Sequence, residues 1–140
     1  MAGLTDYLED KIMNHVFGST TYTKPTNWYV GLLTATPSDD AASSPGTEVS
    51  GGSYARQVCA FTVTGSGTAQ AANTSAITFP TATADWGIVG WVGIYDAVSS
   101  GNLVAFQNLQ KSDFSTTTTK TINDGDIFKF NASTIKIQLD

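Results

Sequence analysis

Residues 79–97 read FPTATADWGIVGWVGIYDA, and this stretch carries the strongest fold signal in the chain. Its two tryptophans, Trp86 and Trp91, lie among glycines and β-branched residues, and it holds no lysine, arginine or histidine. Over residues 88–95 both alternating faces are apolar or glycine. A strand with two apolar faces is covered on both, so this run predicts a strand at the centre of a packed sheet or at a subunit contact.

The length and composition indicate a single β-rich domain over residues 1–140. A chain of this size buries roughly 68–70% of its unfolded surface, enough for one core without metal or disulfide help. Charged residues make up 14% of the chain, a low share for a soluble domain, whereas threonine occurs 21 times. Threonine suits the solvent face of a strand. This composition favours a durable extracellular or particle-borne β-protein, with an ordinary cytosolic β-domain as the alternative.

Charge and apolar patterning argue against two classes of partner. The net charge is −5 and the seven basic residues are scattered from Lys11 to Lys136, so we expect no nucleic-acid partner. No apolar run approaches the ~20 residues of a membrane helix, so we expect no membrane insertion. The opening MAGLTDYLED lacks the pattern of a secretory signal. Cys59 is the single cysteine, which excludes an intramolecular disulfide and favours a buried, inert thiol.

An amphipathic helix is predicted at about residues 5–17, with Thr5 as its N-cap and Gly18 at its end. Its apolar stripe supplies the candidate assembly contacts, because exposed apolar patches of that size are rare on monomers. The stripe either folds back on its own domain or reaches a neighbouring subunit. Its members are Leu4, Leu8, Ile12, Met13, Val16 and Phe17.

After Pro25 the apolar period changes to two, which predicts a mainly β fold of seven or eight strands. Short strands with Gly, Asn and Asp turns favour an antiparallel, jelly-roll-like β-sandwich preceded by one helix. The predicted strands are residues 27–34, 54–64, 75–79, 87–96, 102–109, 116–122, 126–130 and 134–139. The polar run 36–53 is predicted as a long loop with a contact surface. The predicted core is Trp28, Val30, Leu32, Phe61, Val63, Ile77, Phe79, Ile88, Val92, Ile94, Phe106, Phe128, Ile135 and Ile137.

No constellation of residues points to catalysis, a metal or a cofactor, so we expect no enzyme activity. His15 is the single histidine and is expected to favour the C-terminal end of the helix. The run NDGD at 123–126 resembles the start of a calcium loop but lacks its later ligands, so a hairpin turn is expected. We expect Arg56 to fix the turn at 48–56 by pairing with Glu48 or Asp85, a solvated arginine being the alternative.

Several blocks taken in order resemble one family of small tailed-bacteriophage proteins, the tail fibre or tail-associated virion proteins. They are YLEDKIMNHVFGSTTYTKPTNWYVGLLTATP, GTEVSGGSYARQ, FPTATADWG with GIYDA and GNLVAF, and INDGDIFKFNASTIKIQLD. The resemblance covers Tyr7 to Asp140, with a looser match in the serine- and threonine-rich run 112–119.

The resemblance implies a non-enzymatic structural protein of the virion, in a tail fibre or at the neck or collar. It implies a homo-oligomer attached to other virion proteins and made in the host cytoplasm, with which the missing disulfides agree. One alternative is a capsid decoration protein. Another is a carbohydrate-binding module that reads a host surface glycan through exposed tryptophans, although such side chains also fill cores and subunit interfaces.

Overall fold

The computed structural model describes residues 3–65, 69–113 and 115–138. Over these residues the chain is mainly β with one helix, as predicted. The elements are β1 (Gly3–Leu4), α1 (Asp6–Val16), β2 (Trp28–Ala35), β3 (Thr47–Glu48), β4 (Gln57–Cys59), β5 (Phe61–Thr64), β6 (Gln70–Asn73), β7 (Ile77–Thr78), β8 (Gly87–Val89), β9 (Trp91–Tyr95), β10 (Leu103–Asn108), β11 (Lys120–Ile122), β12 (Lys129–Phe130) and β13 (Lys136–Gln138). The chain also carries the turn signal GSG at 65–67, and both this predicted turn and the predicted strand end at Leu139 reach outside the described residues.

The largest sheet has six strands in the order β1-β10-β9-β2-β3, with β4 also paired to β2, and every pairing is antiparallel. Strand β9 lies between β10 and β2, and its residues from Val92 to Tyr95 are buried. The two apolar faces of this run therefore belong to a central strand, which confirms the first alternative of the prediction for β9.

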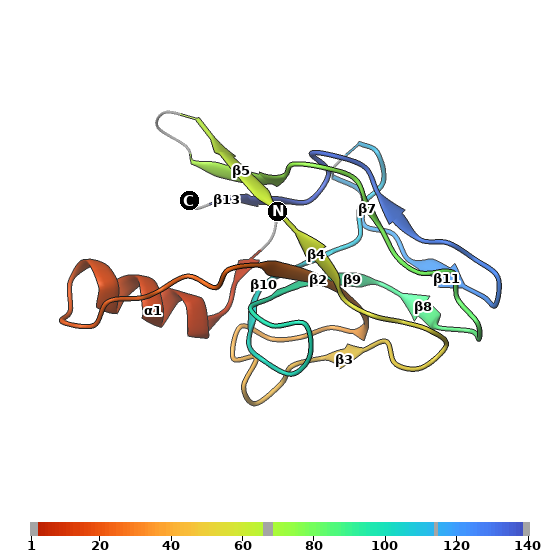
Figure 1. The fold of residues 1–140 in the computed structure, drawn as a ribbon, viewed down its shortest axis with the longest axis horizontal. Coiled ribbons are helices and arrows are strands. Elements are labelled where there is room, and N and C mark those ends of the chain that lie inside the picture. The colour runs from red at the N-terminus through yellow and green to blue at the C-terminus, as the bar shows by residue number, and fades with distance from the viewer. Residues whose placement is uncertain (1–2, 66–68, 114, 139–140) are drawn as a thin grey trace.

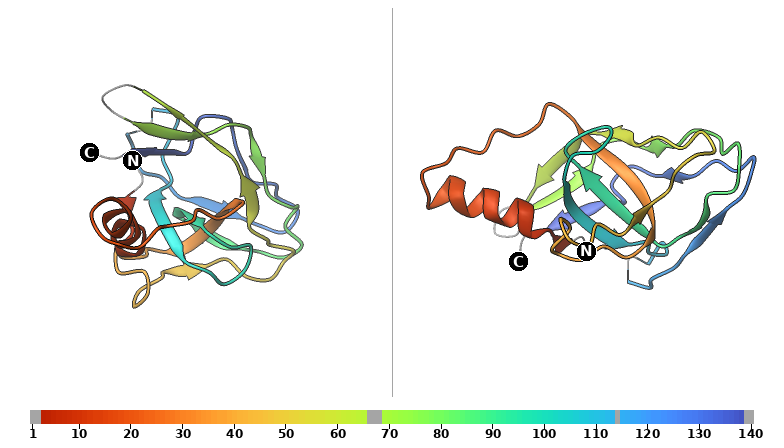
Figure 2. Two further views of the ribbon diagram at one scale, coloured as in Figure 1. Left: turned by 60° about the vertical axis from the view of Figure 1, so that its left-hand side comes forward. Right: turned by 90° about the horizontal axis from the view of Figure 1, so that it is seen from below.

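A second layer lies across from this sheet. It contains the antiparallel sheet β13-β6-β5, and the short ladders β12-β7 and β11-β8 continue towards the end of the molecule opposite α1 (Figures 1 and 2). Apolar side chains from both layers meet between them, in a sandwich-like arrangement that is not a closed barrel.

Two runs predicted as single strands each break at one residue. Residues 54–64 divide at Ala60 into β4 and β5, and residues 87–96 divide at Gly90 into β8 and β9. In each case the two halves pair in different sheets, so the break is a corner where the chain crosses between layers. Both Gly90 backbone groups are bonded at this corner: its N–H donates to Leu33 O at 3.0 Å, and its carbonyl accepts from Leu109 N at 2.9 Å.

Most of the predicted core is buried or packs against the core, but three members were wrong. The corner at Gly90 interrupts the alternation, so Val89 rather than Ile88 points inwards and Ile88 is exposed. Val63 is exposed because the β5–β6 hairpin extends past the opposite layer (Figure 1). Phe106 is only half-buried, since β10 buries its preceding residues Val104 and Ala105 instead.

An aromatic cluster joins the two layers near β7. Phe79 is 1% exposed and meets the rings of Tyr54, Trp86, Phe128 and Phe130 at centroid distances between 6.1 and 6.4 Å. Trp86 is also buried, and its indole N–H donates to Gly52 O at 2.9 Å. Trp86 is therefore a core residue and is not available as an exposed sugar-stacking platform.

Several local predictions need correction. The strands β1 and β6 were missed, and the predicted loop 36–53 contains β3. Twelve strands, β2–β13, follow Pro25 in the described residues, in place of seven or eight. Residues 123–126 form a turn in which Asp126 N donates to Asn123 O at 3.0 Å. This turn is not a hairpin, because the flanking strands β11 and β12 pair with β8 and β7.

Candidate functional site

Helix α1 projects from one end of the molecule, beyond the edge strand β1 (Figures 1 and 2). Thr5 stands at its N-cap but does not cap it with its side chain, because Thr5 Oγ1 donates to Leu103 O at 2.7 Å instead. This buried bond fixes the start of the helix to β10. The helix ends at Val16, and Gly18 N donates to Asn14 O at 3.1 Å just beyond it.

The candidate assembly stripe divides into a packed half and an exposed half. Leu4 and Leu8 are half-buried against the core, and Ile12 is half-buried further along. The remaining three form what we call the helix tip: Met13 is 56%, Val16 60% and Phe17 80% exposed. The helix therefore covers part of its own core with Leu4 and Leu8, and contact of the exposed half with a neighbouring subunit stays a prediction.

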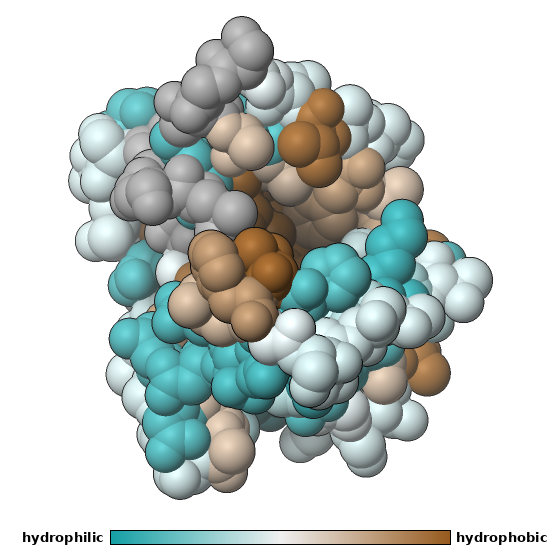
Figure 3. Space-filling view, turned by 90° about the vertical axis from the view of Figure 1, so that its left-hand side faces the viewer, coloured by the Kyte–Doolittle hydropathy of each residue, from teal (hydrophilic) through white to brown (hydrophobic). Residues whose placement is uncertain are grey.

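An apolar hollow opens beside the helix, between the six-stranded sheet and the β13-β6-β5 sheet. Figure 3 shows the brown residues gathered near the centre of this face, next to the hollow. We call this hollow the helix-end groove; its volume is about 550 Å³. Among the described residues, Lys24 is the one charged residue of its lining. The groove is lined by Leu4, Leu8, Lys24, Pro25, Thr26, Asn27, Trp28, Val58, Cys59, Ala60, Phe61, Val63, Ala71, Ile94, Val104, Ala105 and Ile137.

Residues 18–27 return from the helix tip to β2. Tyr22 N donates to His15 Nδ1 at 3.2 Å, so His15 holds this return segment against α1. Burial, with the negative charge of Asp96 next, raises the pKa of the Tyr7 phenol on the first turn of the helix. These contacts are consistent with a structural role for His15 and Tyr7.

A second candidate feature is the Arg56 clasp, made of Arg56, Glu48, Tyr54 and Tyr95. Of the two carboxylates expected for Arg56, the structure pairs it with Glu48: Arg56 Nε donates to Glu48 Oε1 at 2.8 Å and Arg56 Nη2 to Glu48 Oε2 at 2.7 Å. The arginine side chain is 8% and the glutamate side chain 26% exposed. Such a paired fork holds both side chains in one geometry.

The same arginine reaches a second loop. Arg56 Nη1 donates to Ala97 O at 2.8 Å and to Ser100 O at 2.7 Å, so the clasp ties the turn after β9 to β3 and β4. Asp85, the other expected partner, instead accepts from Asp124 N at 2.9 Å. Asp85 thus holds the turn at 123–126 rather than the one at 48–56.

Two glycines make room for the clasp on the outer face of the sheet. Gly31 and Gly93 are paired directly across β2 and β9. A Cβ on Gly31 would lie 2.8 Å from Glu48 Oε1, and one on Gly93 would lie 2.9 Å from the Tyr95 ring. The bare backbone lets Tyr95 lie flat, with the Arg56 guanidinium 3.4 Å from its ring centroid.

The tyrosines of the clasp are held protonated. Burial, with the negative charge of Glu48 next, raises the pKa of Tyr95 to about 12 and also raises the pKa of Tyr54. Tyr54 Oη donates to Glu48 Oε1 at 2.7 Å and accepts from Leu32 N at 2.9 Å. Sequence reasoning missed both tyrosines; the alternation of Gly93 and Tyr95 on one face of a central strand was the available signal.

The described residues hold no group of three or more His, Cys, Asp or Glu side chains that could bind a metal ion. The helix found among them is not long and apolar enough to cross a membrane. Cys59 is buried beside the helix-end groove, and burial raises the pKa of its thiol to about 11. The features available for function are thus surfaces and fixed loops: the helix tip, the helix-end groove and the Arg56 clasp.

A family model described as Podophage GP4 fiber I protein gp80 matches residues 3–138. A search of curated proteins found no match. Because the family match spans nearly the whole chain, the chain belongs to this phage tail fibre family, which confirms the resemblance seen in the sequence. It is therefore a structural component of a phage tail, and the family implies a place in the virion.

Proposed function

We propose that this chain is a homo-oligomeric subunit of the tail fibre whose copies meet through the helix tip. The observation that carries the proposal is the projecting end of α1, where Met13, Val16 and Phe17 stay exposed. The family supports association with other virion proteins. In this role the chain works by binding and holding, without catalysis.

Burial of apolar surface is the expected driving force for such contacts. Phe17 is 80% exposed, so most of its ring is available to a partner. Phage structural proteins act as repeated copies in symmetric assemblies. A second copy of this chain is therefore present as a partner without any further kind of protein. We therefore commit to a second copy as the occupant of this face.

The apolar lining of the helix-end groove makes the groove of a neighbouring copy the place where the tip lies in this proposal. Among the described residues that line the groove, Lys24, Thr26 and Asn27 are polar and the others are apolar. Contact between the helix tip and this groove removes apolar surface of both copies from water.

The segment 36–53 serves, in this proposal, as a second contact surface towards other virion proteins. Its middle, residues 42–45, is exposed, while Glu48 near its end is held by Arg56. The Arg56–Glu48 ion pair thus anchors the end of the segment whose residues 42–45 are exposed. We place the subunit in the fibre, with a neck, collar or decoration position as the alternative.

The test is the mass of the purified chain in solution, measured by light scattering. The wild-type chain should be an oligomer, and Val16→Ser with Phe17→Ser should shift it to a folded monomer. Ile127→Ser is the matched control, because Ile127 is 62% exposed, close to the 60% of Val16, and lies outside α1. A wild-type monomer, or an equal loss of assembly in the Ile127 variant, would overturn the proposal.

A further inference from the structure

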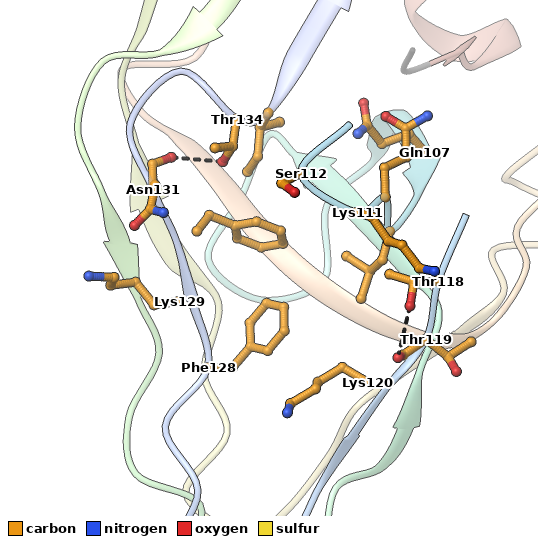
Figure 4. A pocket seen from close by; sticks show the side chains of 14 residues that line it. Gln107, Lys111, Ser112, Thr118, Thr119, Lys120, Phe128, Lys129, Asn131 and Thr134 are labelled. Carbon is orange, nitrogen blue, oxygen red and sulfur yellow. Dashed lines mark hydrogen bonds between the residues drawn. The ribbon is translucent and has the colours of Figure 1, made fainter. Parts of the chain in front are cut away.

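A basic cavity lies near β11 and β12, at the end of the molecule away from α1. Its volume is about 520 Å³, and Lys111, Lys120 and Lys129 line it together with Phe128 and Phe130. Figure 4 shows the three lysines on three sides of Phe128. The Lys111 and Lys129 side chains point outwards in this view, and their flexible stems can turn to a bound group. We call this cavity the lysine pocket.

The lysine pocket is locally positive on an acidic protein. The chain carries a net charge of −5 with seven basic residues, and three of the seven line this one cavity. Its lining includes no Asp or Glu, and the ion pair that the described residues form is between Arg56 and Glu48. The nearby Asp113 lies outside the lining, and its carboxylate keeps its negative charge while accepting from Ser115 N at 2.9 Å and Thr116 Oγ1 at 2.6 Å. The pocket therefore suits an anionic ligand.

The floor of the pocket is aromatic and its walls are polar. The rings of Phe128 and Phe130 meet edge to face at 5.0 Å, and Phe79 supports both from below. Asn131, Thr134 and Gln107 add hydrogen-bonding groups around this floor. Gln107 Oε1 is buried and has no hydrogen-bond partner among the described residues. An apolar floor with surrounding amides and hydroxyls matches a sugar ring, which has apolar faces and polar edges.

A second hollow continues the lysine pocket. Its volume is about 430 Å³, and Lys111, Thr118 and Thr119 line both cavities. Trp91, which is half-buried, lines the second one. The shared wall is fixed by backbone bonds, because Lys111 N donates to Thr116 O at 2.9 Å and Thr118 N to Leu109 O at 2.8 Å. Two aromatic hollows separated by a basic wall fit a ligand of several linked rings.

We propose that the lysine pocket and the Trp91 hollow together bind an oligosaccharide that carries carboxylate or phosphate groups, as found on a host cell surface. This rests on the proposed function, since a fibre subunit held at its helix end has its opposite end free. Phe128 and Trp91 stack on successive sugar rings, and Lys111 and Lys120 pair with the anionic groups between them. The glycan reader anticipated from tryptophans thus uses Trp91, with Trp86 buried in the core.

The test is titration calorimetry on the full chain with three tetrasaccharide probes: a uronic acid, a phosphorylated hexose and a neutral hexose. We expect binding of the uronic acid probe, the phosphorylated probe or both, which tells the two anionic sources apart, and at least tenfold weaker binding of the neutral probe. Binding should weaken as salt is raised. Lys111→Gln with Lys120→Gln should lower affinity about tenfold or more, whereas the control Lys11→Gln, on α1 and outside these cavities, should change it less than twofold.

The proposal is overturned if neither anionic probe binds at millimolar concentration or if the neutral probe binds equally. It is overturned too if Lys11→Gln loses as much affinity as the pocket variant, or if a single-stranded oligonucleotide binds as tightly as the sugars. Light scattering on the same samples reports assembly separately. Loss of sugar binding in an intact oligomer contradicts this inference alone, whereas a wild-type monomer contradicts the proposed function.

Discussion

The end of the molecule that carries α1 and the end that carries β11 and β12 differ in the kind of surface they present. At the helix end, Met13, Val16 and Phe17 are exposed, and an apolar groove opens at the start of α1 beside Leu4 and Leu8. At the other end, three lysines line a cavity together with Phe128 and Phe130. Apolar contacts are non-directional, so an apolar surface is covered well only by a large partner of matching shape. Positive charges beside aromatic rings instead select ligands that carry anionic groups. The difference favours assembly at one end and recognition at the other.

The largest expected effect separates a phenylalanine in the shared core from one at the helix tip. Phe79→Ala should lower the free energy of unfolding by about 3–5 kcal/mol, because it removes a buried ring that four other rings contact. Phe17→Ala, at a ring that is 80% exposed, should change it by less than about 0.5 kcal/mol. Urea unfolding, at a protein concentration low enough to dissociate the oligomer, measures both. Equal effects would mean that the helix tip is part of the core.

The next effect concerns the Arg56 clasp, which ties the turn after β9 to β3 and β4 between the two ends of the molecule. Arg56→Leu leaves the Glu48 carboxylate without its partner, and breaking such a largely buried pair should cost about 3 kcal/mol. Removing both partners, as Arg56→Leu with Glu48→Leu, should cost less because no unpaired charge remains. The same unfolding measurement checks both variants. A single variant that is as stable as the wild-type chain would show that the clasp does not fix these loops.

Alkaline pH should weaken the Arg56 clasp. Burial and the negative charge of Glu48 raise the pKa of Tyr95 to about 12, whereas a tyrosine in the unfolded chain titrates near ~10. Between these values the unfolded chain loses the proton first, so stability should be fully present below pH ~10 and fall as the pH rises towards about 12. Tyr95→Phe should flatten this dependence in pH-resolved unfolding. An identical slope in wild type and variant would contradict the assignment.

Local patterns predicted the helix and most of the strands, because alternation and capping act over a few residues. The corners at Ala60 and Gly90 were missed, since their position depends on where the chain crosses to the opposite layer. Strand β6 was also missed: its sequence QAAN lacks β-branched and aromatic residues and is held by β5 and β13 on either side.

The candidate surfaces were less predictable than the fold. The apolar stripe of the helix could be predicted from its sequence period. Which half of the stripe stays exposed depends on how far the β-sheets extend beneath α1. The choice of Glu48 over Asp85 for Arg56 depends on the pairing of β2 with β3 and β4. The lysine pocket brings Lys111, Lys120 and Lys129 together from separate segments, and in the sequence they appear as scattered charges.

The central claim, that the two ends serve assembly and recognition separately, is tested most directly by the number of copies of this chain in purified phage particles. The count should be made by quantitative immunoblot on phage carrying Val16→Ser with Phe17→Ser, and on phage carrying Lys111→Gln with Lys120→Gln. We predict that the helix-tip variant is absent or strongly depleted, whereas the lysine-pocket variant is incorporated at the wild-type level. Normal incorporation of the helix-tip variant, or depletion of the lysine-pocket variant, would contradict the account.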